Sequence, residues 1–552
     1  MKRYLISSIF IVAMLFSVGI SPAFAQPDEA ALNQLSRQPV QHGGRLKPFD
    51  SFARETVLAI TDKVRFEKNN PTWLVWQWIA DGEAWADRPI LRVRYEALRK
   101  ELKLSDDQPR IAPSVLLNNF QFRTLAQEAI QKDRGKQELT ALEKKRVDLF
   151  NRARHFEAVA RATMPGFIPH AKESSAAWLP LETLTDSDLP RLLASIYTPE
   201  SVSELQASWQ ALNQVIATED ANLREVVSRF VIAHEKILEQ SEVPINRRQI
   251  GVEVQYHKTH PFRWAWILYL VGAIICFVSL IRKETYSPGV IIVLMAFLLS
   301  TIGFALRCYI AGRPPVTNMY ESVVWVSWGA TFFALILYYF YRSTWIVIPA
   351  AIVSALGLVV ADSLPAVLDA SLSPLVPVLR SNYWLTIHVL TITLSYGAFA
   401  LAWGLAHVFL IVSAFQRENT ERLKTVGLFM QRALQIGVIL LAAGTILGGV
   451  WAHYSWGRFW GWDPKETWAL IALLVYLAVL HGRYVNWWGA FGTAVGSLFA
   501  FFGIIMAWYG VNFVLAAGLH SYGFGGGGFP YVLLVVALDV LITLGLVWKA
   551  KH

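Results

Sequence analysis

Tryptophan and acidic side chains are concentrated in one short segment, residues 456–468, whose sequence is WGRFWGWDPKETW. Large aromatic rings bury much apolar area at low entropic cost, and their faces and edges suit stacked and edge-on contacts. Such a surface could hold a flat, conjugated ligand, and a porphyrin is the obvious candidate. The residues that we expect to contact this ligand are Trp456, Trp460, Trp462, Asp463 and Trp468.

Two other roles are open for these residues. Tryptophan is enriched where helices cross a membrane interface, and each ring could belong to such a belt. Asp463, Pro464 and Glu466 also form a helix-start pattern, with the acid as N-cap and proline at the first helical position. In that role the two acids fix the geometry of the loop and do not touch a ligand.

Histidines are the side chains that could ligate a porphyrin iron. His388 lies about one turn inside an apolar segment, and His520 lies in a loop before the last apolar segment. Both are expected on the same side of a membrane as the tryptophans, so they could ligate one iron from opposite faces. Glycines at 525–528 would let the His520 loop close on a bulky ligand. The alternatives are a solvated loop residue for His520 and a core histidine bonded to a carbonyl for His388.

Other histidines and several arginines also have candidate roles. His481 is expected near the opposite end of its span, where it could ligate iron as haem enters. His407 could pair with His481 or pack between helices, and packing is favoured. His453 is either a hydrogen-bonding residue behind the site or an interface residue. Haem propionates are expected to meet basic groups, because guanidinium binds carboxylate through two hydrogen bonds; the candidates are Arg313, Arg380 and Arg458.

The hydropathy pattern predicts an all-α protein in which a polytopic helical membrane domain follows a soluble domain. Residues 1–25 have the basic start, apolar stretch and A-x-A ending of a secretory signal peptide. Residues 26–262 contain no apolar run of about 20 residues and are expected to form a mainly helical extracytoplasmic domain. Residues 263–552 are expected to form about nine transmembrane helices. The expected spans are 264–281, 288–311, 322–341, 344–361, 384–415, 431–454, 466–485, 488–511 and 530–549.

The charge distribution and the cysteine content indicate the orientation of the chain and exclude several classes of protein. Basic residues fall mainly in loops that alternate crossings place in the cytoplasm, which agrees with an exported N-terminal domain. The tryptophan segment is then extracytoplasmic and the C-terminus cytoplasmic, in a bacterial cytoplasmic membrane. The formal charge of +9 therefore indicates orientation and not nucleic-acid binding. Cys276 and Cys308 are the cysteines of the chain, so it has no C-x-x-C redox pair and no C-x-x-C-H haem attachment site.

The motifs resemble those of a known family. Residues 264–549 are similar to cytochrome c biogenesis proteins of the CcsA or ResC type, in the haem-handling superfamily that includes CcmC and CcmF. The segments that carry this resemblance are the tryptophan-rich WWD motif at 456–468, PVTNMYES at 315–322, WLTIH at 384–388 and LHSYG at 519–523. One departure is His453, where an asparagine is usual.

The resemblance implies roles for three histidines. His388 and His520 match the two extracytoplasmic residues that ligate haem iron in the family. His481 matches an intramembrane haem ligand near the cytoplasmic side, whose partner histidine belongs to a CcsB or ResB component. The N-terminal segment 41–55 resembles extensions that precede the CcsA-like half in longer homologues, and the domain around it is expected to dock a partner or to act as a spacer.

The function implied by the resemblance is cytochrome c biogenesis. Haem b would be the transported substrate, carried to the extracytoplasmic face and presented to the CxxCH thiols of apocytochrome c by a component of a holocytochrome c synthase. Expected partners are apocytochrome c, a CcsB or ResB type membrane protein and thiol-reducing proteins. Two other functions are open from the residues alone, a transporter for a non-haem substrate and a membrane anchor for the soluble domain.

Overall fold

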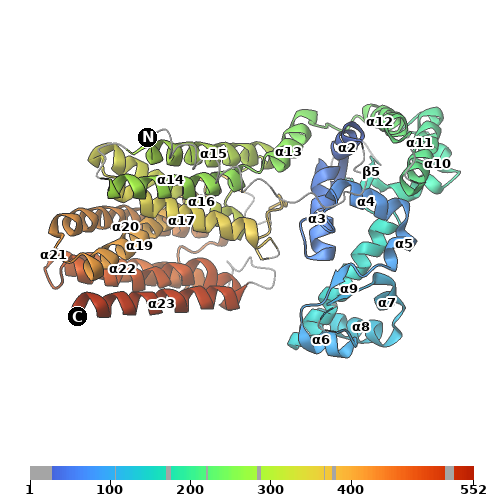
Figure 1. Ribbon diagram of the computed structural model, residues 1–552. Coiled ribbons are helices and arrows are strands. Elements are labelled where there is room, and N and C mark those ends of the chain that lie inside the picture. The colour runs from blue at the N-terminus through green and yellow to red at the C-terminus, as the bar shows by residue number, and fades with distance from the viewer. Residues whose placement is uncertain are drawn as a thin grey trace. The chain divides into compact units, whose positions relative to one another are not determined.

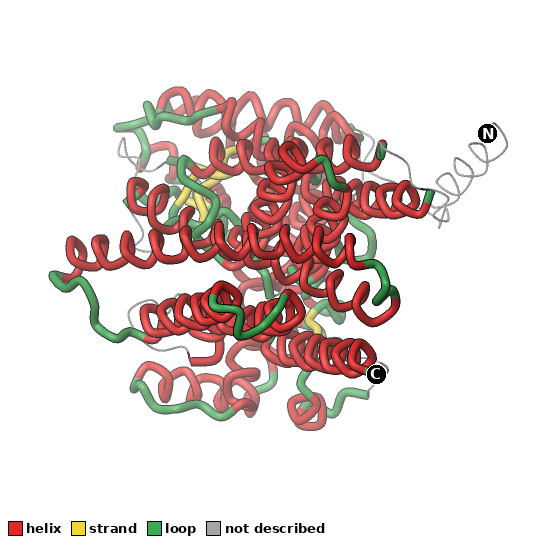
Figure 2. Tube along the Cα trace, turned by 90° about the vertical axis from the view of Figure 1, so that its left-hand side faces the viewer, coloured by secondary structure: helices red, strands yellow, loops and turns green. Residues whose placement is uncertain are grey.

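The computed structural model describes residues 28–105, 107, 109–169, 176–218, 222–282, 287–365, 367–375, 381–515 and 528–552. Helices make up most of this described chain, and its strands are few and short (Figure 2). The chain divides into two compact units. The first runs to His42 and continues over Pro48–Ile245, and the second joins Gly43–Lys47 to Asn246–His552. The predicted signal peptide, residues 1–25, lies outside the described residues.

The first unit consists of short and medium helices with a small antiparallel sheet (Figure 1). Its helices are α2 (Glu29–Ser36), α3 (Phe49–Thr61), α4 (Pro71–Ala80), α5 (Gly82–Ala86), α6 (Glu96–Glu101), α7 (Pro113–Asn118), α8 (Phe120–Arg134), α9 (Ala141–Ala160), η1 (Leu181–Thr185), α10 (Leu189–Leu192), α11 (Pro199–Thr218) and α12 (Leu223–Gln240). Its strands are β1 (Pro39–His42), β3 (Leu91–Arg92), β4 (Arg110–Ile111), β5 (Gly166–Ile168) and β6 (Leu179–Pro180), and β2 (Arg45–Pro48) lies at the boundary of the units. β5 pairs with β1 on one side and β6 on the other, and β3 pairs with β4.

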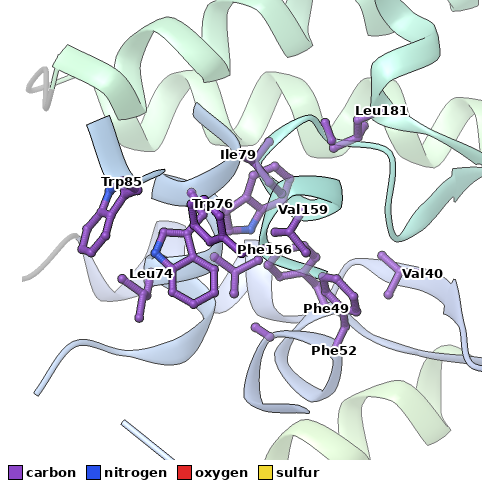
Figure 3. Close-up of a cluster of buried hydrophobic side chains, with 14 of the residues drawn as sticks. Val40, Phe49, Phe52, Leu74, Trp76, Ile79, Trp85, Phe156, Val159 and Leu181 are labelled. Atoms are coloured by element: carbon purple, nitrogen blue, oxygen red, sulfur yellow. The ribbon is translucent and has the colours of Figure 1, made fainter. Parts of the chain in front are cut away.

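A continuous aromatic core fills the first unit (Figure 3). Trp76 is fully buried on α4, where the ring of Phe49 stacks on it at a centroid distance of 4.6 Å. The start of α4 is fixed locally, because the Asn70 side chain accepts the Thr72 backbone N–H and Pro71 occupies the first turn. This unit therefore has a hydrophobic core of its own.

The second unit contains, within the described residues, nine helical segments long and apolar enough to cross a membrane. They are Arg247–Ile281, formed by α13 (Arg247–Thr259) and α14 (Pro261–Ile281), α15 (Pro288–Ala311), α16 (Met319–Tyr341), α17 (Thr344–Ser363), Asn382–Phe415, α20 (Thr420–Trp456), α21 (Pro464–Tyr484), Ala490–Leu515 and α23 (Phe529–Lys551). The chain is thus a multi-pass helical membrane protein, and the predicted fold class is confirmed.

Two of these segments change their winding along their length. Asn382–Phe415 consists of α18 (Asn382–Trp384), the π-helical turn η3 (Leu385–Val389) and α19 (Leu390–Phe415). Ala490–Leu515 consists of α22 (Ala490–Ile505) and a π-helical stretch, η4 (Met506–Leu515). Single π-helical turns often mark functional sites, because they reposition side chains within an otherwise regular helix.

The helix α19 lies at the centre of the bundle, where it packs against α16, α17, α20, α22 and α23 (Figure 1). Glycines permit a close contact with α16: a Cβ atom on Gly397 would lie 3.0 Å from the backbone of Gly329. Small residues at such crossings are typical of membrane helices, where tight van der Waals packing replaces the hydrophobic effect. On another face, Phe399 stacks on Tyr476 of α21 at 3.8 Å. The most heavily packed helix of the bundle therefore carries the histidine of the site just beyond its N-terminal end.

Candidate functional site

A cavity of about 190 Å³ lies within the second unit. Its wall is formed by six segments: the start of α16 with the residues before it, η3 with the start of α19, the last turns of α20, the loop at Trp460, the start of α21, and η4. Both π-helical segments therefore contribute to it. Small-molecule sites commonly enclose about 300–1,000 Å³. A cavity of this size holds part of a macrocycle and leaves the remainder outside.

His388 is the predicted iron ligand that lines this cavity. Its Nδ1 lies 2.8 Å from the backbone carbonyl oxygen of Gly444 on α20. A carbonyl oxygen only accepts, so Nδ1 donates and the ring lone pair resides on Nε2. Hydrogen bonding of this kind orients metal-ligating histidines. His388 therefore makes the hydrogen bond to a backbone carbonyl that was expected for a core histidine. It also lines a cavity, which the iron-ligand role requires.

The ring of His388 sits in a space that glycine leaves open. A Cβ atom on Gly448 would lie 2.6 Å from Cε1 of His388 and 3.2 Å from its two nitrogens. Trp451, one turn further along α20, meets the imidazole edge-on at 5.7 Å. Trp451 in turn lies parallel to Trp384 of α18 at 6.4 Å. Indole rings from α18 and α20 therefore stand beside His388.

The tryptophans of the 456–468 segment occupy different environments. Trp460 lines the cavity, and its ring meets that of Trp462 edge-on at 5.8 Å. Trp462 is itself 69% exposed and has a left-handed backbone (φ 57°). Trp456 lies beneath the guanidinium of Arg458, and Trp468 is partly buried on α21; neither lines the cavity. Three tryptophans line the cavity within the described residues: Trp451, Trp460 and Trp508.

The acids of the segment build the start of α21. Asp463 is the N-cap and forms a capping box with Glu466. Oε2 of Glu466 accepts the backbone N–H groups of Gly461 and Asp463 at 2.7 and 3.2 Å, while Oε1 accepts from Nη1 of Arg458 at 3.0 Å. The helix-start role predicted for the two acids is therefore present. Arg458, one of the predicted propionate partners, is engaged by Glu466.

Several cavity residues were assigned no role from the sequence. Lys465 lies inside the motif, and Asn512 and Trp508 lie on η4. Trp508 Nε1 donates to Ser322 Oγ at 2.9 Å and so ties η4 to α16. Lys465 could have been found from the motif as a cation beside the predicted aromatic surface. Asn512 and Trp508 could not, because their place depends on the π-helical winding of η4.

A buried charge network orders the segment that leads into α16. Glu321 is fully buried and pairs with Arg307 at 2.7 Å and Arg313 at 3.2 Å. Its Oε2 also accepts the backbone N–H and the hydroxyl of Thr317, a residue of the cavity wall. Arg313, another predicted propionate partner, therefore holds this loop in place. Arg380, the third, lies outside the described residues, as does His520.

The other histidines lie apart from the cavity wall. His481 is exposed, and its Nδ1 bonds the carbonyl of Leu477 on its own helix at 2.7 Å. His407 pairs through Nε2 with Asp539 of α23 at 3.1 Å, and not with His481. His453 is exposed at the end of α20.

Known proteins share sequence with the part of the chain that forms this cavity. Residues 316–520 match the family described as cytochrome C assembly protein. A cytochrome c biogenesis protein CcsA from Prochlorococcus marinus (strain NATL2A) is 34% identical over 296 residues, which cover 47% of this chain and 92% of that protein. The protein of the same name from Guillardia theta is 34% identical over 268 residues, or 44% of this chain and 87% of that one. The chain belongs to the CcsA family of cytochrome c biogenesis proteins.

CcsA relatives also include a longer protein. Protein NrfI from Wolinella succinogenes is 37% identical over 235 residues, which are 42% of this chain but 25% of NrfI. The CcsA family match begins at Val316, within the second unit, and includes every segment of the cavity wall. The resemblance drawn from the motifs is therefore confirmed, and cytochrome c assembly is the function of the family.

Proposed function

We propose that this protein carries haem b, as a substrate, to the extracytoplasmic face of the bacterial cytoplasmic membrane and presents it to apocytochrome c. The observation that carries the proposal is His388, whose imidazole lines a cavity beside the WWD motif with Nδ1 donating to Gly444. That hydrogen bond selects Nε2 as the metal-binding nitrogen. Membership of a cytochrome c biogenesis family supports haem as the ligand.

His520 is the proposed second iron ligand. Two imidazoles on one iron leave no open coordination position, which suits carriage of haem rather than oxygen chemistry. Each thiol of the CxxCH segment then adds S–H across one vinyl group, so that no atom is lost and two thioethers form. The thiols must be reduced for this addition, which is why thiol-reducing proteins are proposed partners.

His481 is the proposed ligand at the cytoplasmic entry side. Its exposure near the end of α21 supports this role, because an exposed imidazole in a membrane helix is accessible to a neighbouring helix. The proposed neighbour is a CcsB or ResB type membrane protein that supplies the other axial histidine. Copurification of such a protein, and its reduction when the exposed ring near His481 is removed by Tyr484→Ala, would test this contact.

The experiment that tests the function is an absorption spectrum of the detergent-purified protein, compared among wild type, His388→Ala and His520→Ala. We expect a low-spin bis-histidine haem spectrum in the wild type and a weaker one in each variant, with a parallel fall in c-type cytochrome yield in cells. His453→Ala, which removes an exposed histidine outside the cavity wall, is the matched control. A colourless wild type from haem-replete cells would instead favour a non-haem transporter or a membrane anchor.

A further inference from the structure

The cavity wall contains a cation that has no acceptor among the described residues. Lys465 lies in the first turn of α21 and lines the cavity. Within the described part of the chain, no hydrogen bond or ion pair joins its Nζ to another residue. Lys465 is partly exposed, and its ammonium offers three N–H donors that no described residue engages. An anionic oxygen in the cavity would meet both these donors and the charge.

The nearby acids do not fill that place, because both are occupied. Asp463 acts on Lys465 through its charge, but its carboxylate caps the helix and accepts the Lys465 backbone N–H at 3.0 Å. Glu466 accepts from Arg458 and from two backbone N–H groups. The charges of the helix start are thus balanced in number, while the hydrogen-bonding capacity of the ammonium is unused.

A second donor points to the same conclusion. Nε1 of Trp460 is buried without a hydrogen-bond acceptor among the described residues, and Trp460 lines the same cavity as Lys465. A buried indole N–H normally finds a partner. Both donors flank the N-terminus of α21, where the helix dipole favours negative charge. Two donors, one charged and one neutral, therefore belong to residues that line the same largely apolar cavity.

On the basis of the proposed function, we propose that Lys465 and Trp460 bind a propionate carboxylate of the haem whose iron is ligated by His388. A porphyrin with propionates is a ligand that is apolar over its faces and anionic along one edge, as this wall requires. The vinyl groups of haem lie on the edge opposite the propionates. Anchoring the propionate edge at α21 therefore directs the vinyl edge out of the cavity, toward an approaching apocytochrome.

The test compares haem with its dimethyl ester, in which both propionates are uncharged, by Soret titration of the full-length apoprotein in a neutral detergent. Lys465→Gln should weaken haem binding roughly tenfold to a hundredfold, the usual cost of one charge-assisted hydrogen bond, and leave ester binding unchanged. Lys465→Arg should retain most of the haem affinity. Trp460→Phe keeps the aromatic ring and should weaken haem binding about threefold to tenfold through loss of one neutral hydrogen bond.

Two controls separate this inference from the proposed function. His388→Ala should weaken binding of haem and ester alike, and Lys424→Gln, at an exposed lysine, should change neither. If the wild type binds neither porphyrin, the proposed function fails. If it binds both and Lys465→Gln keeps the wild-type preference for haem over its ester, the propionate site is wrong while haem binding stands.

A phospholipid phosphate presents the same anionic oxygen. In that case Lys465→Gln would bind both porphyrins like the wild type and would copurify with less phosphatidylglycerol. That result would assign the donors to lipid and overturn the propionate proposal.

Discussion

At the scale of single residues, the position of His388 depends on a side chain that is absent. Gly448 leaves the space that the imidazole occupies, and the carbonyl of Gly444, one turn earlier on the same helix, selects its tautomer. Two glycines on α20 thus place and orient one histidine on a different helix. Neither glycine stands out in the sequence, because an apolar membrane helix commonly contains several.

Gly448→Ala is expected to lower haem retention without unfolding the protein. The new Cβ atom would lie 2.6 Å from the imidazole, so the ring must move away from Gly444. Alanine is otherwise the better helix former by about 1 kcal/mol, so the stability of α20 should not fall for local reasons. The ratio of Soret to protein absorbance after purification, together with the melting temperature, measures both effects.

The matched control is Gly545→Ala on α23, where a Cβ atom meets no atom within 4 Å. It should retain haem like the wild type. Equal haem content in the two alanine variants would show that the imidazole does not need its present position.

The sequence predicted part of this site. His388, Trp460 and the capping role of Asp463 follow from residue type and spacing, and the structure places the first two in the cavity wall. Trp456 and Trp462, which were expected to share one surface with Trp460, do not line the cavity. Spacing along an irregular loop does not determine a shared face, and the left-handed backbone of Trp462 turns its ring outward. The roles of the predicted ligands in binding stay predictions.

At the scale of elements, the buried acid on α16 organises the loop beside the cavity. Glu321 joins Arg307 of α15 to Arg313 and Thr317 of the connecting loop. Buried ion pairs gain little over apolar packing, but removing one partner leaves charges without compensation. Here one carboxylate neutralises two guanidinium groups, so its loss leaves two positive charges without a partner carboxylate.

Glu321→Gln should therefore lower the free energy of unfolding by about 3–5 kcal/mol, the usual effect of breaking a buried pair. Thermal unfolding followed by circular dichroism measures this change. Glu421→Gln is the control, because Glu421 is 82% exposed in its pair with Lys424 and surface pairs contribute about 0–1 kcal/mol. Similar melting temperatures for the two variants would contradict a structural role for the network.

Element positions were largely predictable, and their local winding was not. Long apolar runs gave spans that agree with the observed helices to within a few residues at most ends. The helix α20 begins at Thr420 and not near 431, because the Asn419 side chain accepts the Arg422 backbone N–H and caps the helix before its apolar part. The hydrophobic period did not predict the π-helical winding of η3 and η4. These segments contact α20 and α16 in the folded bundle, and residue spacing alone does not reveal such contacts.

At the scale of the whole molecule, the chain combines two units with separate cores. The first contains a partly buried histidine pair, in which the rings of His42 and His155 lie 6.3 Å apart. Burial lowers the pKa of His155 below its usual range. Units with separate cores can unfold in separate transitions, and each transition then has its own dependence on pH.

The first unit should lose stability as the pH falls below about 6.5, the usual pKa of histidine. Between that value and the lower pKa of folded His155, the unfolded state binds more protons than the folded one, so stability rises with pH. Thermal scans of the full-length protein from about pH 7.5 to pH 5.5 should show one transition shifting downward. His155→Leu should flatten that shift.

The control for the pH effect is His453→Leu, which removes an exposed histidine of the second unit. It should leave the pH dependence of the sensitive transition as in the wild type. A pH dependence that survives His155→Leu undiminished would assign the effect to other groups.

The π-helical turn η3 also bears on how such a site can change over generations. A π turn closes its hydrogen bond one residue further along than an α turn, so it accommodates one extra residue. Loss of a single codon within 385–387 would restore α-helical winding and rotate Trp384 by roughly 100° about the helix axis, the angle of one residue. Trp384 would then leave its stack with Trp451, while His388 and the packing of α19 stayed in place. One in-frame deletion could thus remove an indole ring from the surroundings of His388 without disturbing the bundle that supports it.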